Sequence, residues 1–127
     1  MFSKSNLQSI LLTSRIAEAE EFYRNVLGLV LKEKSDGALV FDVNGSDLRV
    51  APVPSTTPSE HTVMGFEVPD VDSIVTFLSN RGVDLVRFDG FPHAENGVLT
   101  TPDGSRVAWF RDPDGNQLSV VQFPKTC

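Results

Sequence analysis

The alternation of apolar and polar residues predicts short strands and two helices, arranged in the same order twice. Residues 6–12 partly alternate, as expected of a strand, and Thr13 and Ser14 then supply a hydroxyl suited to capping a helix. Apolar residues at helical spacing extend this helix to about Leu27, and Gly28 is a natural stop. Turn signals then divide an apolar stretch into three predicted strands, at about 29–34, 37–43 and 47–52.

The second half of the chain repeats this order. A strand is predicted at about 61–68, and Pro69 and Asp70 open a helix that Gly82 closes. Further strands are predicted at about 84–88, 106–111 and 117–123. The first two of these are separated by a loop over 89–105, and loops of this length in a compact domain are often lids or binding loops. Each half is therefore expected to contain a strand, a helix and three strands.

The residues themselves also repeat. Phe22 coincides with Phe77 when the halves are superimposed, and the stretch 41–50 then matches 110–120 with one extra residue. A period this long indicates two copies of one supersecondary unit, each unable to bury its apolar face alone. The halves are therefore expected to share a core and a cleft.

The region between the halves is expected to be an extended linker. The stretch from Pro52 to Glu60 contains three prolines and few apolar residues. The chain is thus predicted to be one α+β domain, with module 1 at 1–52, a linker at 53–60 and module 2 at 61–127.

Composition excludes several classes of protein. The chain has 127 residues, of which 40% are hydrophobic and 22% charged, as expected of one globular domain. A net charge of -6 without a run of basic residues argues against nucleic acid or a membrane as partner. The single cysteine, Cys127, excludes an intrachain disulfide. The sequence shows neither a signal-peptide pattern nor a membrane-length apolar stretch, so a cytoplasmic location is expected.

Two motifs resemble a known group of proteins. The segments 22–28 (FYRNVLG) and 109–116 (WFRDPDGN) are similar to those of the vicinal oxygen chelate superfamily, which includes glyoxalase I, extradiol dioxygenases and bleomycin resistance proteins. The resemblance covers nearly the whole chain. It implies two tandem βαβββ modules that form a curved mixed β-sheet around a small-molecule cavity, and it implies that homodimers are usual.

The resemblance also implies four positions for the ligands of a divalent metal. They fall on Gln8, Arg49, Val63 and Ser119, and the internal repeat pairs Gln8 with Val63 and Arg49 with Ser119. Metal-using relatives have histidine, glutamine or glutamate there, whereas this set includes a guanidinium, which repels a cation. His61 could share a face with Val63, yet one histidine and one glutamine make a poor site. No cofactor is expected, and a divalent metal is the disfavoured alternative.

Arg49 suggests a different use of the same region. Its fixed charge could hold a carboxylate, enolate or phosphate, with Gln8 and Ser119 adding neutral hydrogen bonds. Alternatively, Arg49 pairs with Asp47 or Asp42, or points to solvent.

Three further side chains are candidates for chemistry or recognition. His93, near Glu95 in the long loop, could act as a general acid or base, although a lone loop histidine is more often simply exposed. Tyr23 and Trp109 could stack on an aromatic ligand, but their apolar surroundings favour core packing or burial between helix and sheet.

These observations favour a metal-independent protein that binds a small anionic or aromatic molecule, in the manner of bleomycin resistance proteins. The alternative is a lyase, isomerase or dioxygenase of the glyoxalase or dioxygenase type. Its metal would be held by unusual ligands such as Gln8, His61 and His93, or its acid-base chemistry would need no metal. Whether the protein catalyses a reaction is left open.

Overall fold

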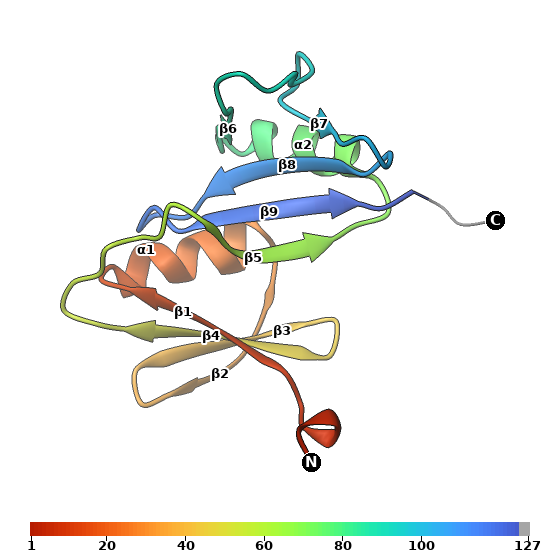
Figure 1. Cartoon of the computed structure of the whole chain (residues 1–127). Coiled ribbons are helices and arrows are strands. Elements are labelled where there is room, and N and C mark those ends of the chain that lie inside the picture. Colours follow the sequence, from red (N-terminus) through yellow and green to blue (C-terminus); the bar gives the residue numbers. More distant parts are fainter. Residues whose placement is uncertain (125–127) are drawn as a thin grey trace. The chain divides into compact units, whose positions relative to one another are not determined.

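A computed structural model describes residues 1–124, so Cys127 lies outside the described residues. The chain divides into two compact units, one spanning Met1–Thr57 and the other starting at Pro58. Each unit has the predicted order of strand, helix and further strands, and each builds a mixed sheet of its own (Figure 1). The predicted α+β class and the βαβββ repeat are confirmed.

The first unit is built on a four-stranded sheet with the order β1-β4-β3-β2. Its elements are the 3-10 turn η1 (Phe2–Lys4) and the strands β1 (Gln8–Thr13), β2 (Val30–Ser35), β3 (Ala38–Val43) and β4 (Ser46–Pro52). Strands β1 and β4 run parallel, whereas the other neighbours are antiparallel. All four strands were predicted, because turn residues separate the apolar stretches.

The helix of the first unit changes type along its length. It begins as α1 (Ile16–Glu20) and continues as the π-helical segment η2 (Glu21–Val26), in which the Leu27 N–H donates to the Phe22 carbonyl at 2.8 Å. Tyr23 is fully buried, and its ring centroid lies 6.0 Å from that of Phe41 on β3. The prediction that Tyr23 packs in the core is confirmed.

This packing defines the two faces of the first sheet. Phe41 and its partner Leu48 face the helix. Arg49 follows Leu48 on β4, so it lies on the face turned away from α1 and η2. Ile10 and Val40 are the register partners of Arg49 on the two neighbouring strands and share that face.

The second unit is built on a five-stranded sheet with the order β5-β9-β8-β6, to which β7 adds by pairing with β8. Its strands are β5 (Thr62–Glu67), β6 (Leu85–Val86), β7 (Leu99–Thr100), β8 (Arg106–Arg111) and β9 (Gln117–Gln122). The strand predicted at 84–88 is shorter than expected, and β7 lies inside the stretch predicted as loop.

The helix of the second unit, α2 (Val71–Asn80), begins at Asp70, which caps it by accepting from the Asp72 and Ser73 amides. It lies along β8 (Figure 1). The carboxylate of Asp72 binds the guanidinium of Arg106 on β8, and the Val71 amide donates to the Gln122 side chain on β9. The helix therefore covers the sheet face that holds four buried side chains, namely Ala108, Phe110, Leu118 and Val120.

The turn between β8 and β9 is held by one carboxylate. Asp112 accepts from the backbone amides of Asp114 and Asn116 at 3.0 and 2.8 Å, and from the Asn116 side chain at 2.9 Å. These bonds explain the sequence DPDGN as a hairpin turn, as predicted.

Candidate functional site

The strand register gives the two units the same arrangement at the candidate positions. In the first sheet Ile10 pairs with Arg49, and in the second Gly65 pairs with Ser119. Ile10 and Gly65 each lie two residues after the first candidate position of their unit, which is Gln8 or Val63. The register therefore supports the equivalence of Arg49 and Ser119 that the repeat suggested.

Arg49 lies near the centre of the first sheet. Its strand, β4, runs between β1 and β3, and its side chain is half-buried between exposed Ile10 and buried Val40. Across residues 1–124, the Arg49 guanidinium has no hydrogen bond and no ion pair. Arg49 is thus a cation in a partly apolar setting that forms no ion pair, although Asp47 and Asp42 lie on the same face of the sheet.

The acids near Arg49 in sequence are bound elsewhere. Asp47 accepts from Lys32 at 2.8 Å, and this hydrogen bond is the main reason why the pKa of Lys32 is raised. Asp42 accepts from the Gly45 amide at 3.1 Å in the β3–β4 turn. The alternative that Arg49 pairs with Asp47 or Asp42 is therefore wrong.

Gln8 lies on the same sheet face as Arg49, whereas the face of the candidate residues on and before β5 is harder to assign. Gln8 is exposed at the start of β1 and pairs with Asp47, on the Arg49 face. The register of β5 shifts between Thr62 and Met64, so Val63, which is 44% exposed, lies at a bulge. His61 precedes the strand, is exposed, and its amide donates to Ser59. Simple alternation cannot assign His61 to the Val63 face, because a bulge interrupts alternation.

Ser119 lies in a row with a glycine and a tryptophan. It pairs with Gly65 on β5 and with Trp109 on β8, so all three residues lie on the sheet face turned away from α2. A Cβ atom added to Gly65 would lie 2.7 Å from the Ser119 Oγ. The interpretation of Trp109 as buried between helix and sheet is wrong, because α2 covers the opposite face and Trp109 is only half-buried.

The Trp109 indole contacts residues of the long loop. Its centroid lies 4.9 Å from the Phe88 ring at 82°, and 6.0 Å from the His93 ring at 71°. The Phe88 amide donates to Nε2 of His93 at 3.0 Å, so Nδ1 carries the proton and donates to the Gly97 carbonyl at 2.8 Å. Both ring nitrogens of His93 are therefore taken up by the backbone, which leaves neither free for proton transfer in this conformation.

The four positions implied for a metal do not fit a divalent cation. Gln8 supplies an amide, Arg49 a guanidinium, Val63 an alkyl group and Ser119 a hydroxyl, so the set has neither a carboxylate nor an imidazole. Within residues 1–124, no group of three or more His, Cys, Asp or Glu side chains could hold a metal ion.

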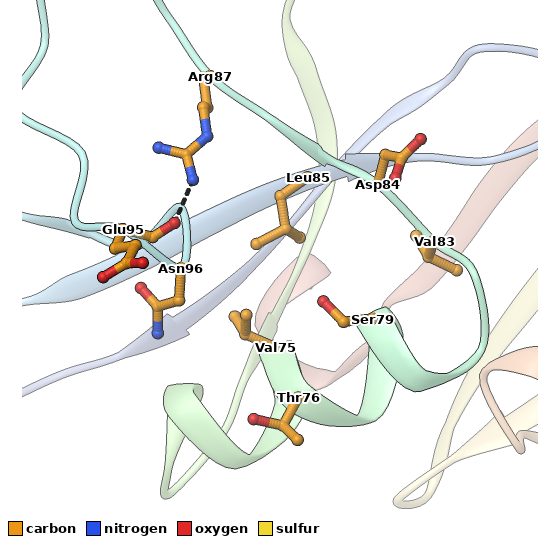
Figure 2. Close-up of a pocket in the computed structure, with 9 residues that line it drawn as sticks. All are labelled: Val75, Thr76, Ser79, Val83, Asp84, Leu85, Arg87, Glu95 and Asn96. Carbon is orange, nitrogen blue, oxygen red and sulfur yellow. Dashed lines mark hydrogen bonds between the residues drawn. The ribbon is translucent and has the colours of Figure 1, made fainter.

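A pocket of about 570 Å³ lies on the other side of the second sheet, beside α2 (Figure 2). It is lined by Val75, Thr76, Ser79, Val83, Asp84, Leu85, Arg87, Glu95 and Asn96. Much of its polar surface is already bonded: the Arg87 guanidinium donates to the carbonyls of Ala94 and Glu95, and the Asn96 amide to Asp72. Sequence reasoning missed this pocket, because no motif marks it beyond the length of the loop.

The network beside this pocket fixes the loop to α2 and β8. Asp72 accepts from Arg106 and also from Asn96 at 2.9 Å. These two hydrogen bonds, with that from Arg106 the larger cause, hold the pKa of Asp72 below its ordinary value. The carboxylate therefore stays ionised, and the contact links the loop to the helix.

Comparison with known proteins agrees with the fold. Residues 7–120 match the family model of the Glyoxalase/Bleomycin resistance protein/Dioxygenase superfamily, and the chain belongs to that superfamily. No curated protein matches the chain.

Several solved structures have the same fold. A superfamily member from Sphaerobacter thermophilus has a TM-score of 0.73 and 22% identity, with 96% of this chain and 99% of that one covered. Lactoylglutathione lyase from Agrobacterium tumefaciens has a TM-score of 0.71 and 21% identity, with coverages of 94% and 93%. A glyoxalase/bleomycin resistance protein from Catenulispora acidiphila has a TM-score of 0.70 and 23% identity, with coverages of 94% and 98%. At these identities the likeness concerns the fold. In the described part of the chain, no helix is both long and apolar enough to cross a membrane.

Proposed function

We propose that the protein binds a small anionic molecule through Arg49, without a resident metal ion. The observation that carries this proposal is the isolation of the Arg49 guanidinium. It lies half-buried on a central strand, and among residues 1–124 it has no anionic partner. The acids Asp42 and Asp47 are occupied by other groups. An external anion would form the ion pair that neither of these two acids forms with Arg49.

A carboxylate is the anion that suits this setting best. A guanidinium holds a carboxylate through two parallel N–H···O bonds, and this geometry orients the bound molecule as well as attracting it. Ile10, which is 59% exposed, flanks Arg49 with apolar surface, whereas Val40 on the other side is buried. Gln8, on the same face, can add a neutral hydrogen bond. A short carboxylate with an apolar body therefore matches the charge and the surroundings of Arg49.

Binding is proposed rather than catalysis. The set Gln8, Arg49, Val63 and Ser119 offers poor ligands for a divalent cation, so the proposal does not use metal chemistry. His93, the candidate acid or base, has both ring nitrogens bonded to the backbone. A lyase, isomerase or dioxygenase activity has no comparable observation in its favour.

The test compares Arg49→Gln with the wild type in titrations with cyclohexanecarboxylate and its neutral amide, followed by calorimetry. The carboxylate should bind the wild type better than the amide does. Arg49→Gln should bind the carboxylate about ten- to a hundredfold more weakly, as expected for the loss of a charge-assisted hydrogen bond. Arg24→Gln is the matched control, since Arg24 is an exposed arginine of the same unit that pairs with Glu20.

Equal affinity of Arg49→Gln and the wild type for the carboxylate would remove the proposal. A parallel titration of metal-stripped protein with Mg²⁺, Mn²⁺, Ni²⁺ and Zn²⁺ tests its metal-free part. About one tightly bound metal per chain, with a matching rise in the melting temperature, would contradict it.

We further propose that the protein is a cytoplasmic homodimer. Exposed apolar residues cluster on and before β1, which is an edge strand: Phe2 is 89% exposed, Leu7 86% and Leu12 44%. Such a cluster on a strand edge is typical of a surface that a second copy covers. Light scattering during size exclusion should give twice the chain mass of 13.9 kDa, and Leu7→Lys should shift it toward the monomer. A monomeric wild type at high concentration would refute the dimer.

A further inference from the structure

The second unit carries a separate combination of an aromatic surface and a cation. Trp109 and Arg111 lie two residues apart on β8, and their register partners are Ser119 and Gln117. They therefore share the sheet face turned away from α2, about 7 Å apart along the strand. We infer that this face binds small aryl carboxylates, with the aromatic ring against Trp109 and the carboxylate on Arg111.

The space beside Trp109 is lined by unusually small residues. Gly65, Ser119 and Trp109 are neighbours across β5, β9 and β8. Gly65 has no side chain, and even a single Cβ atom there would come within 2.7 Å of the Ser119 hydroxyl. Gly65 is exposed, whereas Ser119 between Gly65 and Trp109 is buried, so the exposed part of the half-buried indole is the surface that a flat ring would contact.

The opposite side of the indole is held in place by the loop. Phe88 and His93 pack against Trp109 with their rings nearly perpendicular to it. Hydrogen bonds from the Phe88 amide and to the Gly97 carbonyl fix the His93 ring in turn. The orientation of the indole is thus set before a ligand binds, and such preorganisation lowers the entropic cost of binding.

Arg111 supplies the charge preference. It is exposed, and within residues 1–124 its guanidinium has no ion pair or hydrogen bond. Its register partner Gln117 is buried and donates to Thr62, which leaves the Gln117 side chain fixed beside it. A ring that contacts Trp109 would place an attached carboxylate within reach of Arg111, whereas an aliphatic acid would lack the ring contact.

This inference goes beyond the proposed role of Arg49, because it concerns the other unit, a different arginine and a defined ligand class. Trp109 is the only tryptophan of the chain, so its fluorescence reports on this face directly. The probes are benzoate, 2-naphthoate and the saturated analogue cyclohexanecarboxylate.

Benzoate and 2-naphthoate should change the Trp109 emission in a saturable manner. Arg111→Gln should weaken the response at least about tenfold, and Arg24→Gln, the charge-matched control, should not. For variants of Trp109 itself, calorimetry in an Arg49→Gln background replaces fluorescence, so that the proposed carboxylate site of the first unit does not contribute. There, Trp109→Leu should weaken 2-naphthoate binding several-fold, whereas Trp109→Phe, which keeps an aromatic ring, should retain most of it.

Several results would overturn the inference. They are an unchanged Trp109 emission with both aryl acids, equal binding of cyclohexanecarboxylate and benzoate to the Arg49→Gln protein, or an emission change that is lost in Arg49→Gln but kept in Arg111→Gln. If cyclohexanecarboxylate binds through Arg49 and aryl acids leave Trp109 unaffected, the inference fails and the proposed function stands. If Arg111→Gln weakens the binding of aryl acids but Arg49→Gln weakens the binding of no carboxylate, the proposed function fails and the inference stands.

Discussion

The close approach of Gly65 to Ser119 leads to a quantitative prediction about the second sheet. A methyl group introduced by Gly65→Ala would lie 2.7 Å from the Ser119 Oγ, whereas the next atom, the Ser119 carbonyl oxygen, is 3.8 Å away. The serine hydroxyl is therefore the atom that has to move. Because Oγ turns about one bond, the expected response is a rotamer change and not a shift of the backbone.

Two opposing effects determine the stability of Gly65→Ala. Forcing the serine side chain away from its preferred rotamer costs about 0.5–1.5 kcal/mol. Replacing glycine inside a strand by alanine gains about 0.5–1 kcal/mol. The single substitution is therefore expected to change the free energy of unfolding by about 1 kcal/mol at most, with either sign.

The double substitution separates these effects. In a Ser119→Ala background the obstructing oxygen is gone, so Gly65→Ala should stabilise the protein by about 0.5–1 kcal/mol. The interaction energy between the two substitutions should then be about 0.5–1.5 kcal/mol. Urea unfolding followed by Trp109 fluorescence measures it, since this only tryptophan lies beside Ser119. An interaction energy below about 0.3 kcal/mol would refute the reasoning, because contacting residues should not behave additively.

Two further predictions concern the loop of the second unit. Arg106→Gln should lower stability at neutral pH by about 0.2–1 kcal/mol, the usual contribution of a partly exposed ion pair. Because the folded-state pKa of Asp72 is lowered, this contribution is present above the ordinary aspartate pKa of about 4 and disappears as pH falls through the lower folded value. Urea unfolding of variant and wild type should therefore converge in strong acid, and a constant difference would contradict the assignment. His93→Ala should speed hydrogen exchange at the Phe88 amide, since the ring accepts from it, and unchanged exchange would show that this bond is unimportant in solution.

Most of the fold could be predicted because glycine, asparagine and aspartate residues at turns separate the apolar stretches of the chain. The exceptions are elements that leave a weak local pattern. Strand β7 has two residues, Leu99 and Thr100, and is defined by pairing with β8. The π-helical η2 has the same apolar spacing as an ordinary helix over so few residues. Such elements are set by tertiary contacts and not by local sequence.

The orientation of Trp109 shows why part of the site could not be predicted. The segment from Val107 to Phe110 is continuously apolar, so alternation does not tell which residues face the helix. The structure resolves this through polar residues at the ends of the strands. Arg106 binds Asp72 of α2, which places Ala108 and Phe110 under the helix and turns Trp109 to the other face. Arg106 could have indicated which face of β8 lies under α2, but its partner Asp72 lies 34 residues away in the sequence.

The two faces of β4 are easier to assign from the sequence, because alternation on this strand is regular. Leu48 and Val50 are buried and Arg49 between them is half-buried, as the pattern of apolar and polar residues indicates. Whether Arg49 pairs with an acid could not be deduced, since both Asp47 and Asp42 lie near it in sequence. In the structure neither acid pairs with Arg49, because Asp47 binds Lys32 and Asp42 accepts from the Gly45 amide.

The two units place different chemistry on equivalent rows of three strands. The row in the first unit is Ile10, Arg49 and Val40, and that in the second is Gly65, Ser119 and Trp109. A row that served a divalent cation would need an acid or an imidazole at its centre, and Arg49 and Ser119 are neither.

The duplicated framework has therefore diverged at its central positions, toward a cation in one unit and a small hydroxyl beside an indole in the other. If the two sheet faces recognise ligands by different means, removing Arg49 should leave the Trp109 response unchanged, and removing Arg111 from the face of Trp109 should leave binding at Arg49 unchanged. Affinity for saturated carboxylates should then follow Arg49, and the Trp109 response to aryl acids should follow Arg111. A single substitution that abolished both would show that the two rows act as one site, and the division of roles between the units would have to be abandoned.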